Sequence, residues 1–382
     1  MRRMTEKNNI TSGLFWRFLE RFGAQGVSFV VSIVLARLLN PTIYGTVAIV
    51  TVIMSILQVF IDSGLGNALI QKADADDLDF STVFVFNLLF SSVLYLLMFI
   101  IAPIIAMFYD QPELTAVVRV LCLTLIISGV KNIQQAYISR QMQFKRFFIA
   151  TLCGTVGAAI VGIVMAYLGY GVWALVAQYL FNGIVDTFFL WVTGDWRPQL
   201  KFSFIRFKKL FSFGWKLLVT ALLDTAYMDA TQLIVGKLYK PSELALYNRG
   251  RQFPGLIVIS INSSIDSVML PTLSRQQDNI ESLRGMTRRA IKFGIFVMAP
   301  MMIGLAFVSE SVVRLILGEQ WVGCVFYLKV YCIIYMFMPI LTTNISAIKA
   351  LGRSDIVLRF EIIKKSQHWS CYWVRFGLVF ER

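Results

Sequence analysis

Long apolar segments, repeated along the whole chain, constrain the fold more than any other feature of this sequence. A helix that crosses roughly 30 Å of hydrocarbon needs about 20 predominantly apolar residues. Segments of this kind are predicted near residues 13–38, 43–70, 80–108, 113–139, 146–168, 172–193, 209–236, 243–271, 285–309 and 322–348. Lipid excludes open loops and exposed sheet edges, so the pattern predicts an all-α polytopic membrane protein with about ten transmembrane helices.

The balance of charged residues supports a membrane protein and argues against a nucleic-acid partner. Only 15% of the residues are charged and 57% are hydrophobic, whereas a soluble domain carries about a quarter charged residues. The formal net charge of +14 comes from short basic clusters between the apolar segments. Binding along a phosphate backbone needs a continuous basic surface instead.

The basic clusters also predict the orientation. They lie at alternate junctions, on the same side as the basic N-terminus, and comprise Arg2, Arg3, Lys7, Arg140, Lys145, Arg146, Arg197, Lys201, Arg206, Lys208, Lys209, Arg284, Arg288, Arg289 and Lys292. The opposite junctions at 109–113 and 168–171 carry no base. Because Lys and Arg collect on the cytoplasmic side, we expect a multi-pass protein of the cell (inner or plasma) membrane with a cytoplasmic N-terminus.

Two segments occur twice in the same order. "ARLLNPTIYGTVAI" at 36–49 is echoed by "GKLYKPSELALYNR" at 236–249, and "IDSGLGNALIQ" at 61–71 by "IDSVMLPTLSR" at 265–275. An even number of predicted helices separates the copies, which predicts two parallel pseudo-repeats. The expected organisation is a six-helix N-lobe over 1–200 and an incomplete C-lobe over 201–353, followed by an aborted eleventh helix and a divergent tail over 354–382.

These segments, together with "MDATQLIVGK" and "LYNRG", resemble the polysaccharide transporter branch of the multidrug/oligosaccharidyl-lipid/polysaccharide flippase superfamily. The resemblance implies a two-lobed flippase of fourteen helices. Such proteins move undecaprenyl-pyrophosphate-linked oligosaccharides from the inner to the outer leaflet by alternating access, for exopolysaccharide, capsule or lipopolysaccharide assembly. Ala245 departs from the family, which usually has Gly there. The sequence after Lys365 also departs, which favours a C-terminal truncation.

Charged residues inside apolar segments mark the candidate site, because each costs about 2.5–3.5 kcal/mol on insertion scales. The bases predicted to bind a pyrophosphate are Arg17, Arg21, Lys216, Arg249 and Arg251. Arginine offers phosphate oxygens a planar fork of donors. The alternative is that these bases reach the membrane interface or form structural pairs. Asp224 and Asp229 are candidates for binding a coupling proton or cation, with structural pairing as the alternative. Lys131 and Asp186 are further charges inside apolar segments, and no role is assigned to them.

Several other patterns suggest structural roles. Gly154, Ala158 and Gly162 form a small-residue stripe that predicts close helix packing. Four tryptophans near predicted helix ends are interpreted as membrane-interface anchors, and these are Trp16, Trp173, Trp191 and Trp196. The acidic run at Asp74, Asp76, Asp77 and Asp79 suits a solvated loop before a helix N-terminus better than a metal site.

The sequence offers no pattern for catalysis. It has no P-loop, nucleophile elbow or paired catalytic carboxylates, and its five Cys and single His lack metal-site spacing. We therefore expect a transporter without a cofactor and not an enzyme. The expected partners are a lipid-linked oligosaccharide, membrane lipids and a polysaccharide polymerase. The alternatives are a cation-coupled multidrug exporter, a membrane-embedded glycosyltransferase or polymerase, and a truncated remnant without transport activity.

Overall fold

The computed structural model describes residues 23–62, 64–72, 74–141, 143–274 and 280–351, and the single positions 356 and 360. At a few positions inside helices, Lys216 among them, only the backbone is described. The described residues form helices, turns and loops and contain no strand. The chain divides into two compact units, residues 1–245 and 246–382, and each is described by itself.

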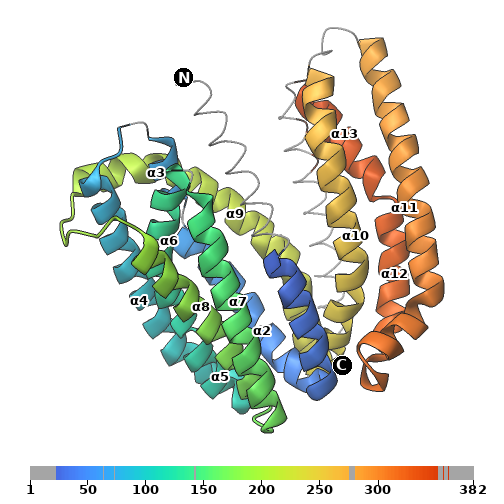
Figure 1. Ribbon diagram of the computed structural model, residues 1–382, viewed down its shortest axis with the longest axis horizontal. Coiled ribbons are helices and arrows are strands. Elements are labelled where there is room, and N and C mark those ends of the chain that lie inside the picture. Colours follow the sequence, from blue (N-terminus) through green and yellow to red (C-terminus); the bar gives the residue numbers. More distant parts are fainter. Residues whose placement is uncertain are drawn as a thin grey trace, which may run out of the picture. The chain divides into compact units, whose positions relative to one another are not determined.

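The first unit is built from helices throughout (Figure 1). A helix over Gly23–Leu38 comes first. The helices that follow are α2 (Pro41–Asp62), α3 (Leu65–Gln71), α4 (Asp77–Phe108), α5 (Glu113–Leu121), α6 (Leu123–Arg140), α7 (Phe144–Tyr167), α8 (Val172–Thr193) and α9 (Phe204–Leu238). The next helix, α10 (Pro241–Ser274), begins with the last residues of this unit.

The second unit holds the rest of α10 and the helices after it. These are α11 (Ile280–Ile316), a short 3₁₀ helix η1 (Glu319–Trp321), α12 (Cys324–Met336) and α13 (Met338–Ala350). Within this unit α12 and α13 both pack against α11.

Seven helices of the described chain are long and apolar enough to cross a membrane. They are Pro41–Asp62, Asp77–Phe108, Glu113–Arg140, Lys145–Tyr167, Val172–Thr193, Glu281–Ile316 and Cys324–Ile348. The predicted all-α polytopic class is thereby confirmed. The predicted segments 209–236 and 243–271 are helical as α9 and α10 but are not among the seven. The count of about ten spans stays a prediction.

Three predicted segments are interrupted. Segment 43–70 divides into α2 and α3, segment 113–139 into α5 and α6, and segment 322–348 into α12 and α13. The first interruption is the sharpest, because Gly64 before α3 has φ of 66°, in the left-handed region. Glycine enters this region without the steric cost that a Cβ imposes. A count of apolar residues does not detect such a local change of direction.

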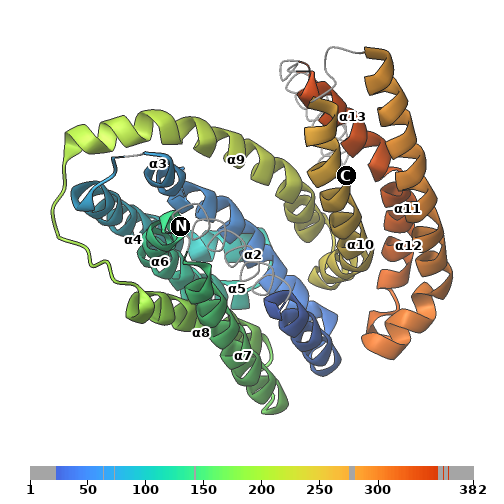
Figure 2. The same ribbon diagram turned by 45° about the horizontal axis from the view of Figure 1, so that its top comes forward.

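The small-residue stripe packs as predicted. α7 and α8 run side by side (Figures 1 and 2). A Cβ at Gly154 would lie 3.3 Å from the carbonyl oxygen of Asn182, and one at Gly162 would lie 3.2 Å from Cβ of Gln178, both on α8. Ala158 between them is buried. Small side chains thus let the two backbones approach closely.

Trp196 was expected at a membrane interface, and this expectation is wrong. Its side chain is 5% exposed and packs in a core with Leu65, Leu69, Phe80 and Leu210. The segment after α8 folds back onto α4 and α6, where the Trp196 ring lies 5.8 Å from the ring of Phe80. The position of Trp196 near the end of a predicted helix therefore did not indicate that its side chain is buried. Trp16 lies outside the described residues.

The acidic run begins α4, as the loop interpretation predicted. Asp76 and Asp79 form a reciprocal capping box at the helix N-terminus. Asp79 is buried and forms ion pairs with Lys72 at 2.5 Å and Arg206 at 3.3 Å. Hydrogen bonds from the Asp79 backbone N–H and from Arg206 lower the pKa of Asp76 below its ordinary value. These carboxylates stabilise a helix start and tie the start of α9 to it.

α9 belongs with the first unit in this structure. It packs against α2, α3 and α4, and Figure 2 shows it as a long curved helix. We had expected α9 to open the C-lobe at residue 201, and that lobe boundary stays a prediction. The predicted tail over 354–382 lies outside the described residues, apart from positions 356 and 360.

The two copies of the repeated junction meet inside the first unit. A Cβ added at Gly45 would overlap the carbonyl oxygen of Pro241. Gly236, the first residue of the second copy, lies against Ile49 and Leu244. The start of α2 and the start of α10 are therefore in backbone contact, and the absence of a side chain at Gly45 permits it.

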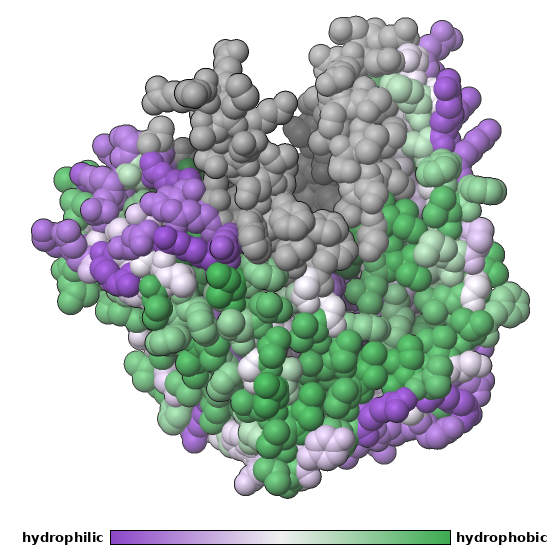
Figure 3. Space-filling model, in the orientation of Figure 1, coloured by the Kyte–Doolittle hydropathy of each residue, from purple (hydrophilic) through white to green (hydrophobic). Residues whose placement is uncertain are grey.

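The surface agrees with a membrane environment. On the face shown in Figure 3, hydrophobic residues cover broad areas, and hydrophilic residues gather toward the ends of the helices. Large apolar side chains such as Ile100 (71% exposed) and Phe307 (83%) lie open on α4 and α11. Such surfaces are stable when lipid covers them.

Candidate functional site

A polar pocket lies beside the break between α2 and α3. Its volume is about 290 Å³, and its wall comes from the end of α2, from α3, α4 and α6. The polar residues that line it are Asp62, Asn87, Asn132, Gln135 and Ser139. We therefore treat this pocket as the candidate site of the first unit.

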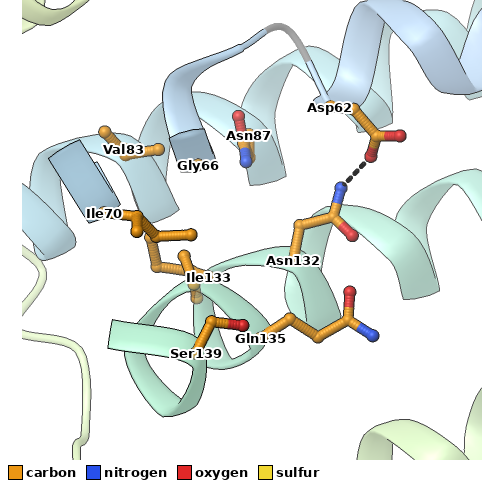
Figure 4. A pocket seen from close by; sticks show the side chains of 10 residues that line it. Asp62, Gly66, Ile70, Val83, Asn87, Asn132, Ile133, Gln135 and Ser139 are labelled. Carbon is orange, nitrogen blue, oxygen red and sulfur yellow. Dashed lines mark hydrogen bonds between the residues drawn. The ribbon is translucent and has the colours of Figure 1, made fainter. Parts of the chain in front are cut away.

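Asp62 is the charged residue of the pocket and the last residue of α2. One of its carboxylate oxygens, Oδ1, accepts hydrogen bonds from Asn132 and, at 3.0 Å, from Gln58 Nε2. Figure 4 shows Asp62 and Asn132 facing each other. Because a carboxylate only accepts, the Asn132 amide nitrogen must point to it. The Asn132 oxygen consequently points away from Asp62, toward the side of Gln135 (Figure 4).

Asn87 lines the same pocket from α4. Its side chain is only 3% exposed, and its Oδ1 atom has no hydrogen-bond partner. A buried amide oxygen without a partner is unfavourable by about 1–3 kcal/mol. An unsatisfied group of this kind is more often kept where a ligand or water can use the site.

An ion pair inside the helical bundle lies next to this pocket. Lys131 of α6 contacts Asp186 of α8, with 3.2 Å between Nζ and Oδ2. The Asp186 side chain is 10% exposed and that of Lys131 22% exposed. The sequence singled out both residues as intramembrane charges without pairing them. Their pairing reduces the cost of each charge.

The predicted acids on α9 have different surroundings. Asp229 accepts hydrogen bonds from Ser55 of α2 and, at 2.9 Å, from Gln232. Asp224 is exposed. The Asp229 contacts suit the structural alternative, and the role in binding a coupling ion stays a prediction for both residues.

The predicted bases fall into two groups. Arg17 and Arg21 lie outside the described residues, and so does the side chain of Lys216. Arg249 and Arg251 lie in the second unit on α10. The structure thus brings two of the five predicted bases onto one helix within one unit.

Arg249 is buried against an aromatic ring. It is 8% exposed, and its guanidinium carbon lies 5.4 Å from the ring centre of Trp321. It also donates to Gln252 Oε1 at 2.8 Å. Arginine stacked in this way is stabilised by the ring electrons.

Arg251 lies beside a cluster of three tyrosines. Its Nε donates to the Tyr335 hydroxyl at 3.2 Å. The Tyr331 hydroxyl donates to that of Tyr247, and the rings of Tyr331 and Tyr335 lie 5.2 Å apart. The arrangement places donors and aromatic faces together, which are the groups that bind phosphate oxygens and sugar rings.

A second pocket, of about 340 Å³, lies between α11 and α12. Its wall is mainly apolar and includes Met302, Phe307, Ile333 and Met336. A surface of this kind suits hydrocarbon and offers few groups for recognising a polar ligand.

The sequence pointed to Arg249, Arg251, Asp224 and Asp229 but missed the pocket around Asp62. Asp62 was within a quoted repeat and inside the predicted segment 43–70, and no role was assigned to it. Asn132 and Gln135 are neutral, so a search for charges inside apolar segments passed over them. Two signals were available: the Ser-Gly pair after Asp62, which can break a helix, and the polar run "KNIQQ" inside an otherwise apolar segment.

Comparison with known proteins identifies the family. A family model described as polysaccharide biosynthesis protein matches residues 34–326, which is more than half of the chain. The chain belongs to this family. The expectation of a polysaccharide transporter family is thereby confirmed, and with it a family of membrane transport proteins.

Three relatives illustrate the polysaccharide biosynthesis family. Teichuronic acid biosynthesis protein TuaB of Bacillus subtilis is 26% identical over 80% of this chain. Succinoglycan biosynthesis transport protein ExoT of Rhizobium meliloti and lipopolysaccharide biosynthesis protein WzxC of Escherichia coli are each 21% identical, over 93% and 94% of this chain. The chain spans 63% of the length of TuaB, less than two thirds, and 72% and 74% of ExoT and WzxC.

Two solved structures share the fold. Lipid II flippase MurJ in an inward closed conformation matches with a TM-score of 0.70 and 14% identity, over 89% of this chain and 76% of that chain. An inward-facing multidrug resistance MATE family transporter of the MOP superfamily matches with a TM-score of 0.67 and 16% identity, over 89% of this chain and 83% of that chain. The polytopic transporter fold expected from the sequence is confirmed.

Proposed function

We propose that this polysaccharide biosynthesis family member moves a lipid-linked oligosaccharide from the inner to the outer leaflet of the cell membrane. The family match over 34–326 carries this proposal. The names of ExoT, a transport protein, and WzxC, a lipopolysaccharide biosynthesis protein, support it. MurJ, a lipid II flippase with the same fold, also supports it.

The proposal includes an orientation and a set of partners. The alternation of basic clusters favours a cytoplasmic N-terminus, so the substrate is loaded from the cytoplasmic leaflet and released by alternating access. The partners are the lipid-linked oligosaccharide, membrane lipids and a polymerase that receives the translocated unit.

Arg249 and Arg251 are proposed to bind the pyrophosphate, together with Lys216, Arg17 and Arg21. Arg249 supports this role by its burial and by its stacking on Trp321. A guanidinium held this way is weakly hydrated, and phosphate oxygens can replace its water at low cost. Asp224 and Asp229 remain proposed coupling-ion ligands.

The second candidate function is cation-coupled drug export, because the MATE transporter shares the fold. Fold alone does not decide between the two substrates. The family match and the bases on α10 favour an anionic, lipid-linked substrate over a cationic drug.

Deleting the gene in its native host tests the proposal. We expect loss of a surface polysaccharide, accumulation of a polyprenyl-linked oligosaccharide in the membrane fraction, and unchanged drug susceptibility. Restoring the chain on a plasmid should reverse both changes. Normal polysaccharide with no accumulated intermediate would overturn the proposal, and greater drug susceptibility alone would favour the second candidate.

A further inference from the structure

We propose that the first turns of α9, residues 204–215, bind the headgroups of anionic phospholipids at the membrane surface. Lys208 and Lys209 contact the lipid phosphates, and the exposed aromatic side chains beside them enter the headgroup region. This inference goes beyond the proposed function and does not depend on it, because it concerns the lipids around the protein at rest and not the transported substrate.

The first support is the depth at which this segment lies. The start of α9 packs against α3 and α4, and Figures 1 and 2 show it crossing the end of the bundle beside them. The Ser203 backbone N–H donates to Thr82 Oγ1 at 3.2 Å, and Arg206 pairs with Asp76, the N-cap of α4. α4 has 32 residues, more than the hydrocarbon layer needs, so its start reaches the headgroup region. The first turns of α9 therefore lie at headgroup level.

The second support is the division of this helix into faces. The buried and half-buried positions recur at helical spacing, and they are Ser203, Arg206, Phe207, Leu210 and Gly214. The Phe207 ring lies 4.6 Å from the ring of Phe86 on α4, and Leu210 belongs to the core cluster with Phe80. This face holds the segment on the bundle and leaves its other faces open.

The third support is the apolar character of an open flank. Phe204 is 69% exposed, and Phe211 and Trp215 are exposed as well. Because these three residues are seven and four positions apart, they share one flank of the helix. Such side chains on a segment that does not span the membrane mark a surface that enters the membrane interface, where aromatic rings are enriched.

The fourth support is the charge beside this flank. Lys208 is four residues after Phe204 and three before Phe211, so it lies on the same side, and Lys209 follows it. Both lysines are exposed, and no ion pair engages either of them within the part of the chain that the structure describes. Arg206, in contrast, is paired with α4.

Free lysines next to exposed aromatic residues identify the class of lipid. A lysine lays its apolar stem along the interface and extends its ammonium group to the headgroups, and a helix with bases on one side and Phe and Trp on the other binds anionic membranes. The orientation predicted from the basic clusters puts this segment on the cytoplasmic side, whose leaflet carries anionic lipids. The surface is therefore complementary to anionic headgroups.

Binding can be measured on the purified full chain in a neutral detergent. The melting temperature is followed as phosphatidylglycerol or phosphatidylcholine is added to the micelles. A ligand that binds the folded state raises the melting temperature in a saturable way. We expect saturable stabilisation by phosphatidylglycerol and much less by phosphatidylcholine or by inorganic phosphate.

The double variant Lys208→Gln, Lys209→Gln removes two charges from an exposed surface. It should raise the half-saturating amount of phosphatidylglycerol roughly thirtyfold, because each base near an anionic surface strengthens binding about fivefold. The matched control is Arg288→Gln, Arg289→Gln, which removes two exposed charges from α11. This control should keep the response to phosphatidylglycerol.

The aromatic flank has a readout of its own. The fluorescence of Trp215, obtained as the difference between the unchanged protein and Trp215→Phe, should be quenched by phosphatidylglycerol that is brominated near its headgroup. Full fluorescence in that lipid would show that lipid does not cover the flank, and the insertion would be refuted.

Four results of the melting experiment would overturn the proposal. Equal stabilisation by the two lipids would show that headgroup charge has no effect. Equal stabilisation by inorganic phosphate would assign the lysines to a soluble anion. A full response in the lysine variant would leave these bases to a protein partner, and an equal loss in the α11 control would show that only the net charge matters.

Discussion

The two copies of the "IDS" segment fold differently, although the sequence repeats them in the same order. In the first copy the helix ends at Asp62 and starts again at Leu65. In the second copy α10 runs without interruption through Ser274. At the shared offset Val268 replaces Gly64. A β-branched residue is strongly disfavoured at positive φ, whereas glycine is not. One residue type thus distinguishes a broken helix with a polar pocket from a continuous helix.

The largest expected effect concerns the ion pair between Lys131 of α6 and Asp186 of α8, in the unit that holds the broken copy. Asp186→Ala should reduce the free energy of unfolding by about 3 kcal/mol, because it leaves Lys131 charged and unpaired inside the bundle. Thermal unfolding in detergent measures this. The double variant Lys131→Met, Asp186→Leu should recover at least half of the loss. Asp195→Ala, which breaks an exposed pair with Arg146, should cost less than about 1 kcal/mol.

The next largest change in the free energy of unfolding is expected when Gly64 and Val268 are each replaced by the other's residue type. Gly64→Val should destabilise the protein by about 2 kcal/mol, because a side chain is forced into the left-handed region or the break must straighten. The reciprocal Val268→Gly should cost no more than about 1 kcal/mol, the penalty of glycine within a helix. Equal melting temperatures for the two variants would show that Gly64 does not determine the break.

A smaller effect is expected at the repeated prolines. Gly45→Ala makes the first junction resemble the second, where Ala245 stands at the matching place. The new methyl group overlaps the Pro241 carbonyl, so we expect a loss of about 1–2 kcal/mol. Gly26→Ala is the control, because a Cβ there meets nothing within 4 Å. Gly26→Ala should be neutral or slightly stabilising. If Gly26→Ala lowered the stability as much as Gly45→Ala, the overlap with Pro241 would not be the cause of the loss.

The smallest effect concerns the helix start after the first copy. Asp76→Ala should cost about 1 kcal/mol, because it removes the cap of α4. The folded protein lowers the pKa of Asp76 below the ordinary 3.8, so the carboxylate contributes stability at neutral pH and loses it as the pH falls below that value. Asp76→Asn should keep the cap and lose this pH dependence. If the melting temperatures of the unchanged protein and of Asp76→Asn changed in parallel between neutral and acidic pH, Asp76 would not be the source of the pH dependence.

The sequence predicted the features that depend on the length and spacing of apolar segments. The segment predicted over 172–193 matches α8 at both ends, and the small-residue stripe was correctly assigned to helix packing. The breaks were missed because a single residue at positive φ hardly changes hydropathy. Trp196 was misplaced because its burial depends on a return of the chain onto α4, which no local pattern reveals.

The candidate site was less predictable for a related reason. Intramembrane charge was the search criterion, and it found Lys131, Asp186, Arg249 and Arg251. The pocket instead combines one carboxylate at a helix end with neutral amides from α4 and α6. Those residues come together only through the packing of four helices. The family was predictable because the resemblance depends on the order of several motifs along the chain.

The contact between Lys131 and Asp186 has a consequence for biogenesis. The two residues are 55 positions apart and lie in different spanning segments, so the segment with the lysine leaves the ribosome first. An unpaired lysine at the centre of a helix raises the cost of partitioning from the translocon by about 2.5–3.5 kcal/mol. The apolar residues of Glu113–Arg140 must offset that cost until the segment Val172–Thr193 has been synthesised and inserted. The first unit therefore has an assembly order, in which the later segment neutralises the charge of the earlier one.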